Sequence, residues 1–223
     1  MFILKENYKK IKCVDGCDLF EDKNNYSYWE ENEVTIDEKE ITEFLNKSNL
    51  SLKKNFLHIG IGNSFVALNL KNYNQIDGIS ISNNEIVKAN NLKISNYKVY
   101  LKNKYSSGDL ILDKINFYDF IIDNNLKSFA CCNNAFEDLI KKYKKYLKKD
   151  GSIISSFRGM NWSRIVKPVY GFSLKKIFYK KLKEFDGPSS NLMSLQDCQN
   201  LCSKYHFNLI KTFSNLVLFT NKI

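Results

Sequence analysis

The chain has 223 residues and a net charge of +10, and this length suits one domain with a full hydrophobic core and modest additions. It contains no run of 18 or more uncharged apolar residues, and Lys5 and Glu6 interrupt the apolar start before a signal-peptide core is reached, so we expect a cytoplasmic protein without a membrane span. Only two of the 34 basic residues are arginines, the side chains that base and phosphate readout favours; we therefore expect no nucleic-acid partner and attribute the charge to solvated lysine faces.

The six cysteines and two histidines do not suggest a metal centre. No two cysteines have Cys-x-x-Cys spacing, and Cys198 and Cys202 are four residues apart, which places both on one face of a helix. We therefore expect free, buried thiols and no bound metal.

The first 50 residues differ in charge from the rest of the chain. They carry 12 acidic residues and 7 lysines, a net charge of −5, which leaves +15 for residues 51–223. The segment is polar and irregular up to Thr35, where a helical pattern begins. Its aromatic residues, among them Tyr28 and Trp29, either anchor the segment to the core or cover a binding cleft. We therefore divide the chain into a helical and irregular cover, residues 1–50, and one domain formed by residues 51–223.

Residues 56–64 combine a short apolar run with two glycines one residue apart. The apolar run is typical of a buried strand, and residues 64–70 have the apolar density of a helix packed on a sheet. Gly60 and Gly62 permit positive φ and let a ligand approach the main chain closely, while the free N–H groups of a new helix favour electronegative atoms. We expect a ligand over the C-terminal end of this strand.

Strands and helices then alternate along the chain, which predicts a parallel, doubly wound α/β sheet. The last two strands are joined by a two-residue link, which predicts an antiparallel hairpin. The expected strands are residues 76–81, 97–101, 117–123, 152–157, 207–212 and 215–220. One expected helix begins at Ser82, and two others cover residues 135–149 and 194–204.

Two local signals mark helix ends in this stretch. Ser82 and Glu85 have the spacing of a capping box, in which each side chain accepts a hydrogen bond from the other residue's N–H. Gly151 follows the helix expected at residues 135–149 and is interpreted as the signal that ends it.

These landmarks resemble class I S-adenosylmethionine-dependent methyltransferases over residues 56–157. The glycine turn is similar to the first motif of that family, and the order of the later landmarks also fits. The resemblance implies a seven-stranded sheet with an antiparallel last strand, and an enzyme that uses S-adenosylmethionine and releases S-adenosylhomocysteine. The later landmarks are residues 75–82 for the second strand, 105–110 for the adenine loop, 118–124 for the fourth strand and 147–154 for the turn and fifth strand.

The resemblance also implies a role for individual residues. The glycine turn would border the methionine part of the cofactor, Ser80 and Ile81 would flank ribose and adenine, and Asp109 would accept a hydrogen bond from the adenine amino group. Asp123 would lie beside the donated methyl group and is the candidate catalytic residue. The cofactor-binding residues expected on this basis are His58, Gly60, Gly62, Asn63, Ser64, Ser80, Ile81, Asp109, Leu110, Asp123 and Asn124.

Three residues depart from the pattern of the family. His58 stands where an acid is usual and is interpreted as a packed or loop-orienting residue, and Ser64 replaces a frequent third glycine. Ser80 occupies the place of the acid that binds both ribose hydroxyls. A serine makes one neutral hydrogen bond where a carboxylate makes two charge-assisted ones, a difference of roughly 1–3 kcal/mol in cofactor affinity.

Residues 158–193 interrupt the alternation of strands and helices at the point where this fold often carries elements that cover the substrate. We interpret them as a substrate cap; an amphipathic surface helix, for example in a homodimer contact, is the alternative. Both arginines of the chain lie here and suit bidentate contact with a carboxylate or phosphate. The candidate substrate residues are Tyr28, Trp29, Arg158, Trp162 and Arg164.

The sequence does not identify the methyl acceptor. A small molecule, such as a metabolite, a lipid precursor or a sugar, is the leading interpretation. An RNA or protein methyltransferase is one alternative, although residues 123–126 lack the Asp/Asn-Pro-Pro-Tyr motif of enzymes that methylate amino groups of nucleic acids. A cofactor-binding or regulatory protein that has lost catalysis is the other, because Ser80 and the scarcity of candidate bases fit it.

Overall fold

The computed structural model describes residues 33–48, 50–106, 108–127, 130, 133–157, 193–211 and 215–222. The candidate substrate residues Tyr28, Trp29, Arg158, Trp162 and Arg164 lie outside these ranges. The helices are α1 (Ile36–Lys47), α2 (Phe65–Leu70), α3 (Asn83–Asn91), α4 (Asn133–Tyr146) and α6 (Leu195–Tyr205). The strands are β1 (Asn55–Ile59), β2 (Gln75–Ser80), β3 (Tyr97–Leu101), β4 (Tyr118–Ile122), β5 (Leu147–Ser156), β6 (Phe207–Lys211) and β7 (Leu216–Asn221).

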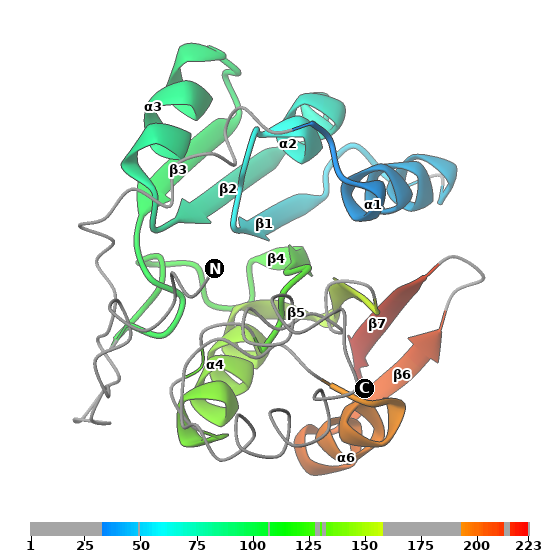
Figure 1. Ribbon diagram of the computed structural model, residues 1–223. Coiled ribbons are helices and arrows are strands. Elements are labelled where there is room, and N and C mark those ends of the chain that lie inside the picture. Colours follow the sequence, from blue (N-terminus) through cyan, green and yellow to red (C-terminus); the bar gives the residue numbers. More distant parts are fainter. Residues whose placement is uncertain are drawn as a thin grey trace, which may run out of the picture.

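The strands form one seven-stranded sheet in the order β3-β2-β1-β4-β5-β7-β6 (Figure 1). Strands β1 to β5 are parallel, and β7 runs antiparallel to both β5 and β6. The predicted sheet with an antiparallel last strand is therefore confirmed, as is the hairpin of β6 and β7. The order reverses between β1 and β4, and in open α/β sheets ligands bind at the carboxyl ends of the strands where the order reverses.

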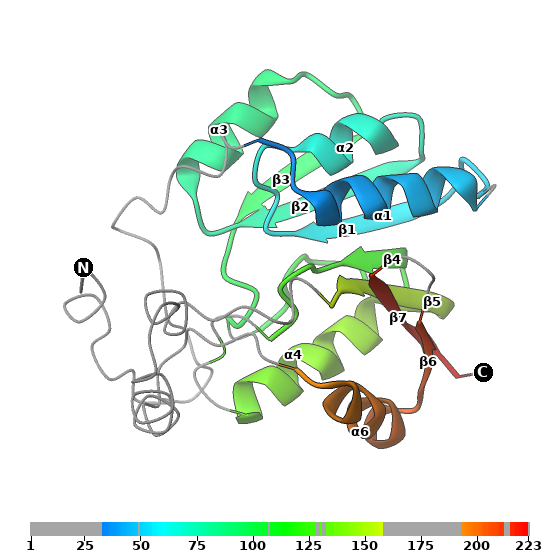
Figure 2. The ribbon, with the colours of Figure 1, turned by 45° about the vertical axis from the view of Figure 1, so that its right-hand side comes forward.

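Helices cover both faces of the sheet (Figures 1 and 2). Helices α1, α2 and α3 lie on one face, where α1 and α2 pack Ile41 and Leu70 against Phe56. Helices α4 and α6 lie on the other, where Leu139 packs in one cluster with Leu57. Burial on both faces explains why the central strands are nearly continuous apolar runs in the sequence.

Helix α1 belongs to the segment interpreted as a cover, yet it is part of the core. Ile41 and Leu45 are completely buried in the cluster that contains strand residues of β1 and β2. At the start of this helix, the Ser156 hydroxyl at the end of β5 donates to Asp37 Oδ1 at 2.8 Å. The helical part of the expected cover is therefore packed into the domain, and a boundary at residue 50 stays a prediction.

Strand β5 begins earlier than expected. Helix α4 ends at Tyr146, and Leu147, predicted to be helical, already pairs with Tyr118 of β4. The pairing register then shifts before Ser152, and a Cβ at Gly151 would lie 3.0 Å from the Tyr118 carbonyl oxygen. Gly151 therefore serves a close approach of two strands, and its interpretation as a helix end is wrong.

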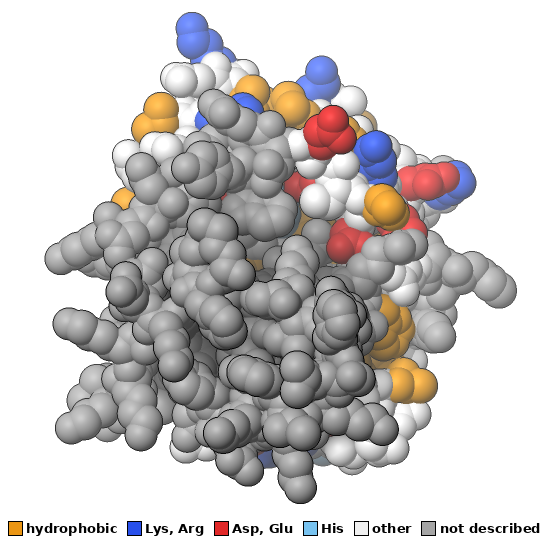
Figure 3. All heavy atoms as spheres, in the orientation of Figure 1, with side chains coloured by type: hydrophobic (Ala, Val, Ile, Leu, Met, Phe, Trp, Pro, Cys, Tyr) orange, Lys and Arg blue, Asp and Glu red, His pale blue; other side chains and the backbone are white. Residues whose placement is uncertain are grey.

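No helix in the ranges that the structure describes is both long and apolar enough to cross a membrane. Acidic and basic side chains are mixed over the part of the surface where α1 lies (Figure 3). One such pair on α1 is Lys47 with Glu43, 2.5 Å apart.

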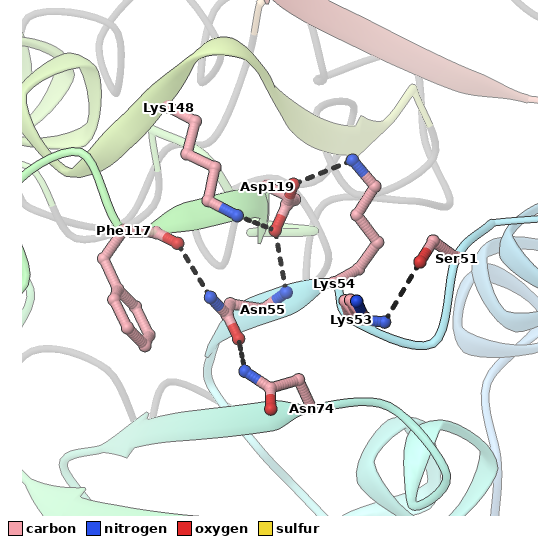
Figure 4. A network of polar contacts seen from close by, with 8 residues as sticks. All are labelled: Ser51, Lys53, Lys54, Asn55, Asn74, Phe117, Asp119 and Lys148. Carbon is pink, nitrogen blue, oxygen red and sulfur yellow. Dashed lines mark hydrogen bonds and ion pairs between the residues drawn. The ribbon is translucent and has the colours of Figure 1, made fainter.

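A buried carboxylate ties three strands together at the amino edge of the sheet (Figure 4). Asp119 of β4 accepts hydrogen bonds from Lys54 Nζ (2.8 Å), Lys148 Nζ (2.7 Å) and the Asn55 N–H (2.9 Å). Asn55 in turn accepts from Asn74 Nδ2 at 2.6 Å, just before β2. Burial alone would raise the pKa of Asp119, but the hydrogen bonds from Lys148, Lys54 and Asn55 outweigh it and hold that pKa below its ordinary value.

We predict that Asp119→Asn lowers the free energy of unfolding by about 1.5–3 kcal/mol, because it removes hydrogen bonds to a charged group and leaves two lysines without a counter-ion. The matched control is Asp138→Asn, which breaks an exposed pair with Lys141 and is expected to cost less than about 1 kcal/mol. Urea unfolding of both variants measures this. Equal losses would contradict the role given to Asp119.

Candidate functional site

The loop after β1 turns with three residues of positive φ. These are Gly60 (+73°), Gly62 (+51°) and Ser64 (+62°). The Gly60 N–H donates to the Ile79 carbonyl oxygen at 2.8 Å and so extends the pairing of β1 with β2 by one residue. A Cβ built on Gly60 would meet no atom within 4 Å, so this residue faces open space at the carboxyl end of β1. The main chain at Gly60 is therefore exposed, and the contact with a ligand expected there stays a prediction.

Residues beneath the loop fix its shape. Gly78 of β2 has no room for a side chain, because a Cβ there would lie 2.8 Å from Ile61 Cγ2 and 2.9 Å from Tyr97 OH. Tyr97 thus crosses over Gly78, and its hydroxyl lies 3.3 Å from Ser64 Oγ. Ser64 is completely buried and precedes α2 with its side chain turned inward. The serine that replaces a glycine in the pattern therefore anchors the loop from inside; a direct ligand contact through its hydroxyl is not supported.

Glu85 joins the loop after β1 to the loop after β2. Its Oε2 accepts from Ser80 Oγ at 2.6 Å and from the Gly62 N–H at 3.1 Å. Ser82 does cap α3, because its Oγ accepts from the Glu85 N–H, but its own N–H donates to Ser80 Oγ at 2.9 Å. The predicted capping box is therefore only half present. The Glu85 carboxylate instead accepts from two donors at the sheet edge, the Ser80 hydroxyl and the Gly62 N–H. Glu85 was not among the site residues expected from the sequence.

Asp123, the candidate catalytic residue, is 1% exposed and heavily engaged. Its Oδ2 accepts from Lys104 Nζ (2.9 Å) and Tyr143 OH (2.8 Å), and its Oδ1 accepts from the Asn125 N–H (3.2 Å). Burial lowers the pKa of Lys104, although the Asp123 charge opposes that effect, and burial raises the pKa of Tyr143 well above its ordinary value. This carboxylate secures the end of β4 to the chain that follows β3, and the geometry does not support its use as a general base.

The neighbouring residue, Asn124, is better placed for a ligand. It is partly exposed, and its Oδ1 is buried without a hydrogen-bond partner in the described part of the chain. A buried acceptor without a partner is costly unless a ligand or water satisfies it. Since β4 lies next to β1, this oxygen belongs to the same edge of the sheet as Gly60.

Asp109 and Leu110 lie beside the end of α4. Asp109 Oδ1 lies 2.9 Å from Lys145 Nζ and accepts from Tyr146 OH at 3.2 Å, while the Leu110 N–H donates to the same hydroxyl at 2.7 Å. These hydrogen bonds to Asp109 hold its pKa below the ordinary value. Helix α4 ends at Tyr146, at the amino edge of the sheet, while Lys102 Nζ, just after β3, also donates to the Asp109 carbonyl oxygen at 2.5 Å. The expected contact of Asp109 with adenine stays a prediction.

The carboxyl end of β3 is followed by residues 102–104. The Lys102 N–H donates to the Ser80 carbonyl oxygen at 2.8 Å, which places this turn next to the end of β2. The interval between Asp109 and β4 could not reveal that the chain passes along α4 before it enters that strand. Lys104 was missed because its partner, Asp123, is 19 residues away and no local pattern connects them.

His58 lies inside the sheet at 2% exposure, two residues before Gly60. By the alternation along a strand it shares the face of Phe56, which α1 and α2 cover. Its Nδ1 has no hydrogen-bond partner within the described residues, and burial lowers the pKa of His58 to about 4. The interpretation as a packed residue fits this position better than a contact with the cofactor.

The comparisons with known proteins concern the fold. No protein-family model matches the chain, and no curated protein matches it significantly. Among solved structures, a SAM-dependent methyltransferase from Methanosarcina mazei is similar, with a TM-score of 0.59, 14% identity, and coverage of 80% of this chain and 97% of that chain. An N-methyltransferase from Bradyrhizobium japonicum has a TM-score of 0.53 and 13% identity, with 83% and 97% covered. A SAM-dependent methyltransferase from Aquifex aeolicus has a TM-score of 0.51 and 12% identity, with 80% and 87% covered.

The chain has the class I methyltransferase fold. In this methyltransferase fold the described residues bring together the loops after β1, β2 and β4, with Gly60, Gly62, Ser80, Glu85 and Asn124 at the sheet edge. Ile81, between Ser80 and Ser82, lies in the same edge and is partly exposed. The described ranges contain no cluster of three or more His, Cys, Asp or Glu side chains able to hold a metal ion.

We predict that His58 makes the methyltransferase fold sensitive to mild acid. In the folded protein the pKa of His58 is about 4, below the ordinary value of 6.5. Between pH 4 and pH 6.5 this histidine therefore binds a proton in the unfolded chain but not in the folded protein. The free energy of unfolding is therefore unaffected by this histidine above pH 6.5, and it falls as the pH decreases towards 4, by at most about 1.4 kcal/mol per pH unit. Unfolding titrations between pH 6.5 and 5 measure this slope.

His58→Phe should reduce the slope strongly, because it keeps a buried ring and removes the titration. The matched control is His206→Asn, which alters the other histidine, an exposed residue with positive φ that asparagine also adopts. A slope that persists in His58→Phe and disappears in His206→Asn would refute this assignment.

Proposed function

We propose that this protein is a methyltransferase that transfers a methyl group from S-adenosylmethionine to a small-molecule acceptor. The observation that carries the proposal is the Gly60 loop, which presents main chain to open space at the carboxyl end of β1, where the strand order reverses. The resemblance of the sequence and the likeness to solved methyltransferases of the same fold support it.

The residues at this edge fit the chemical groups of the cofactor. The open side of Gly60 leaves room for a ligand against the backbone, and the unpartnered Asn124 Oδ1 is an acceptor suited to an ammonium group such as that of the methionine part. When bound, S-adenosylmethionine supplies a methyl group on a positively charged sulfur. Asn63 fixes the loop next to Gly62, because its Oδ1 accepts from the Phe65 N–H at 2.9 Å.

The chain's own task in this reaction is to hold two reactants in line. Correct orientation supplies much of the rate in such a displacement, and a base is required only if the acceptor must lose a proton. Asp123 and Lys104 hold the end of β4 in position and are proposed to act only by doing so. An acceptor that is already a nucleophile without losing a proton fits this site best.

The acceptor is proposed to contact the cap at residues 158–193 together with Tyr28 and Trp29. Both arginines of the chain, Arg158 and Arg164, follow the end of β5 closely in the sequence. Guanidinium groups bind carboxylates and phosphates in a bidentate manner that lysine does not reproduce. A small acceptor with an acidic group is therefore the form of the proposal that we favour.

We predict that Gly60→Val abolishes the binding of S-adenosylhomocysteine, measured by calorimetry. The new side chain would enter the open space that the ligand is proposed to fill, and valine tolerates the φ of +73° poorly. The fold is checked by circular dichroism.

Gly108→Val is the matched control for strain. Gly108 has a φ of +76° and also meets no atom within 4 Å of an added Cβ, but it lies in the long loop before β4. This variant carries the same backbone strain without the contact proposed for Gly60, so it should weaken binding less than Gly60→Val does. Unchanged binding by a folded Gly60→Val would overturn the proposed site.

A further inference from the structure

Strand β3 forms one edge of the sheet, at the end where α3 lies (Figure 1). Just after this strand, the Lys102 N–H donates to the Ser80 carbonyl oxygen of β2. Neighbouring residues of a parallel strand turn their main-chain groups to opposite sides, so Leu101 and Val99 direct theirs away from β2. Within the residues that the structure describes, no strand pairs with this outer side.

The edge formed by β3 has few of the features that prevent pairing with another chain. Such features are charged side chains, proline, a bulge, or an element that covers the edge. The strand reads Tyr-Lys-Val-Tyr-Leu, and its register with β2 is unbroken over five residue pairs. Its one charged residue, Lys98, stands opposite the buried carboxylate Asp77. The other edge strand, β6, contains Asn208, a residue type that is depleted in strands.

Exposed aliphatic side chains lie on β3 and on the two segments beside it, helix α3 and the loop that leads to β4. They are between 49% and 75% exposed: Val87 of α3, Leu101 of β3, and Leu112 and Ile115 of the loop. Helix α3 packs against β3, and the loop is held to the sheet because Lys114 Nζ lies 3.9 Å from Asp77 Oδ2. An apolar surface around an open strand edge is typical of a site for another protein chain.

The sequence of β3 is complementary to a second copy of itself in antiparallel pairing. In the register that places the two Val99 residues opposite each other, Tyr97 of one copy faces Leu101 of the other. Lys98 then faces Tyr100, so the two lysines stay apart and each ammonium group approaches a tyrosine ring. The low charge of this edge matters because the chain carries a net charge of +10, and two copies repel where their lysine-rich surfaces meet.

We propose that this protein forms a homodimer in which the β3 strands of two copies pair antiparallel and join the two sheets into one. The contact is isologous, because each copy contributes the same strand edge. Val87 of α3 borders it on one face of the joined sheet, and Leu112 and Ile115 border it on the other. This inference goes beyond the proposed function and does not depend on it.

The test measures the mass of the full chain by analytical ultracentrifugation over a series of concentrations. The parent should have the monomer mass of 26.1 kDa when dilute and approach twice that mass as the concentration rises. Leu101→Lys brings an added charge into the contact from each copy and should weaken the dimer roughly 10- to 100-fold. Ile210→Lys is the matched control, because Ile210 is an exposed aliphatic residue on β6, the other edge strand. It should dimerise as the parent does.

Hydrogen exchange distinguishes pairing of strand edges from any other contact between copies. The N–H groups of Val99 and Leu101, which face outward, should exchange more slowly as the concentration of the parent rises. The N–H of Lys98, which faces β2, should change less. Val99→Pro removes one outward donor and leaves the bonds to β2 in place, so it should abolish this protection at Leu101.

The proposal is overturned if the parent keeps the monomer mass at every concentration. It is also overturned if the dimer persists in a folded Leu101→Lys, or if Ile210→Lys weakens the dimer as strongly. If Leu101→Lys does not fold by circular dichroism, exchange in the parent decides the question: a dimer without added protection at Val99 and Leu101 is not formed through β3. None of these results bears on the methyltransferase proposal, which the binding of S-adenosylhomocysteine tests separately.

Discussion

The hydrogen bond from the Gly60 N–H to the Ile79 carbonyl oxygen is the interaction on which the site depends. It carries the parallel pairing of β1 and β2 one residue beyond β1, and only then does the chain turn with positive φ. The point at which the glycine loop leaves the carboxyl edge of the sheet is therefore fixed relative to the end of β2. Because the two loops begin side by side, the carboxylate of Glu85 accepts hydrogen bonds both from the Gly62 N–H and from the Ser80 hydroxyl.

Strand β4 carries a buried carboxylate at each end, and both are neutralised by lysine. Asp119 at the amino edge contacts Lys54 and Lys148, and Asp123 at the carboxyl edge contacts Lys104. Both pairs join segments far apart in the sequence. Part of the lysine content of this chain thus serves the interior, so net charge alone says little about partners. The same pairing explains why an aspartate in a promising position is not available as a base.

The sequence predicted the sheet well because its strands are apolar on both faces and its turns carry glycine or asparagine. The predicted end of the helix at residues 135–149 was wrong because Leu147 continues the apolar face of α4, and only its pairing with Tyr118 assigns it to β5. The capping box predicted for Ser82 and Glu85 is half present because the Glu85 carboxylate accepts from Ser80, a donor outside the helix. The role of Asp109 was inferred from an interval along the chain and stays a prediction. The residues expected in the cap lie outside the described ranges and stay predictions.

Gly78 has a consequence for how the site moves. Its missing side chain lets Tyr97, from the edge strand β3, reach across β2 to the buried Ser64 at the start of α2. Edge strands are held by neighbours on one side only and open more readily than central ones. The glycine loop is thus held in part by one of the two edge strands of the sheet. We therefore expect opening of that edge to loosen the glycine loop, and a ligand that orders the loop to protect β3 against exchange with solvent.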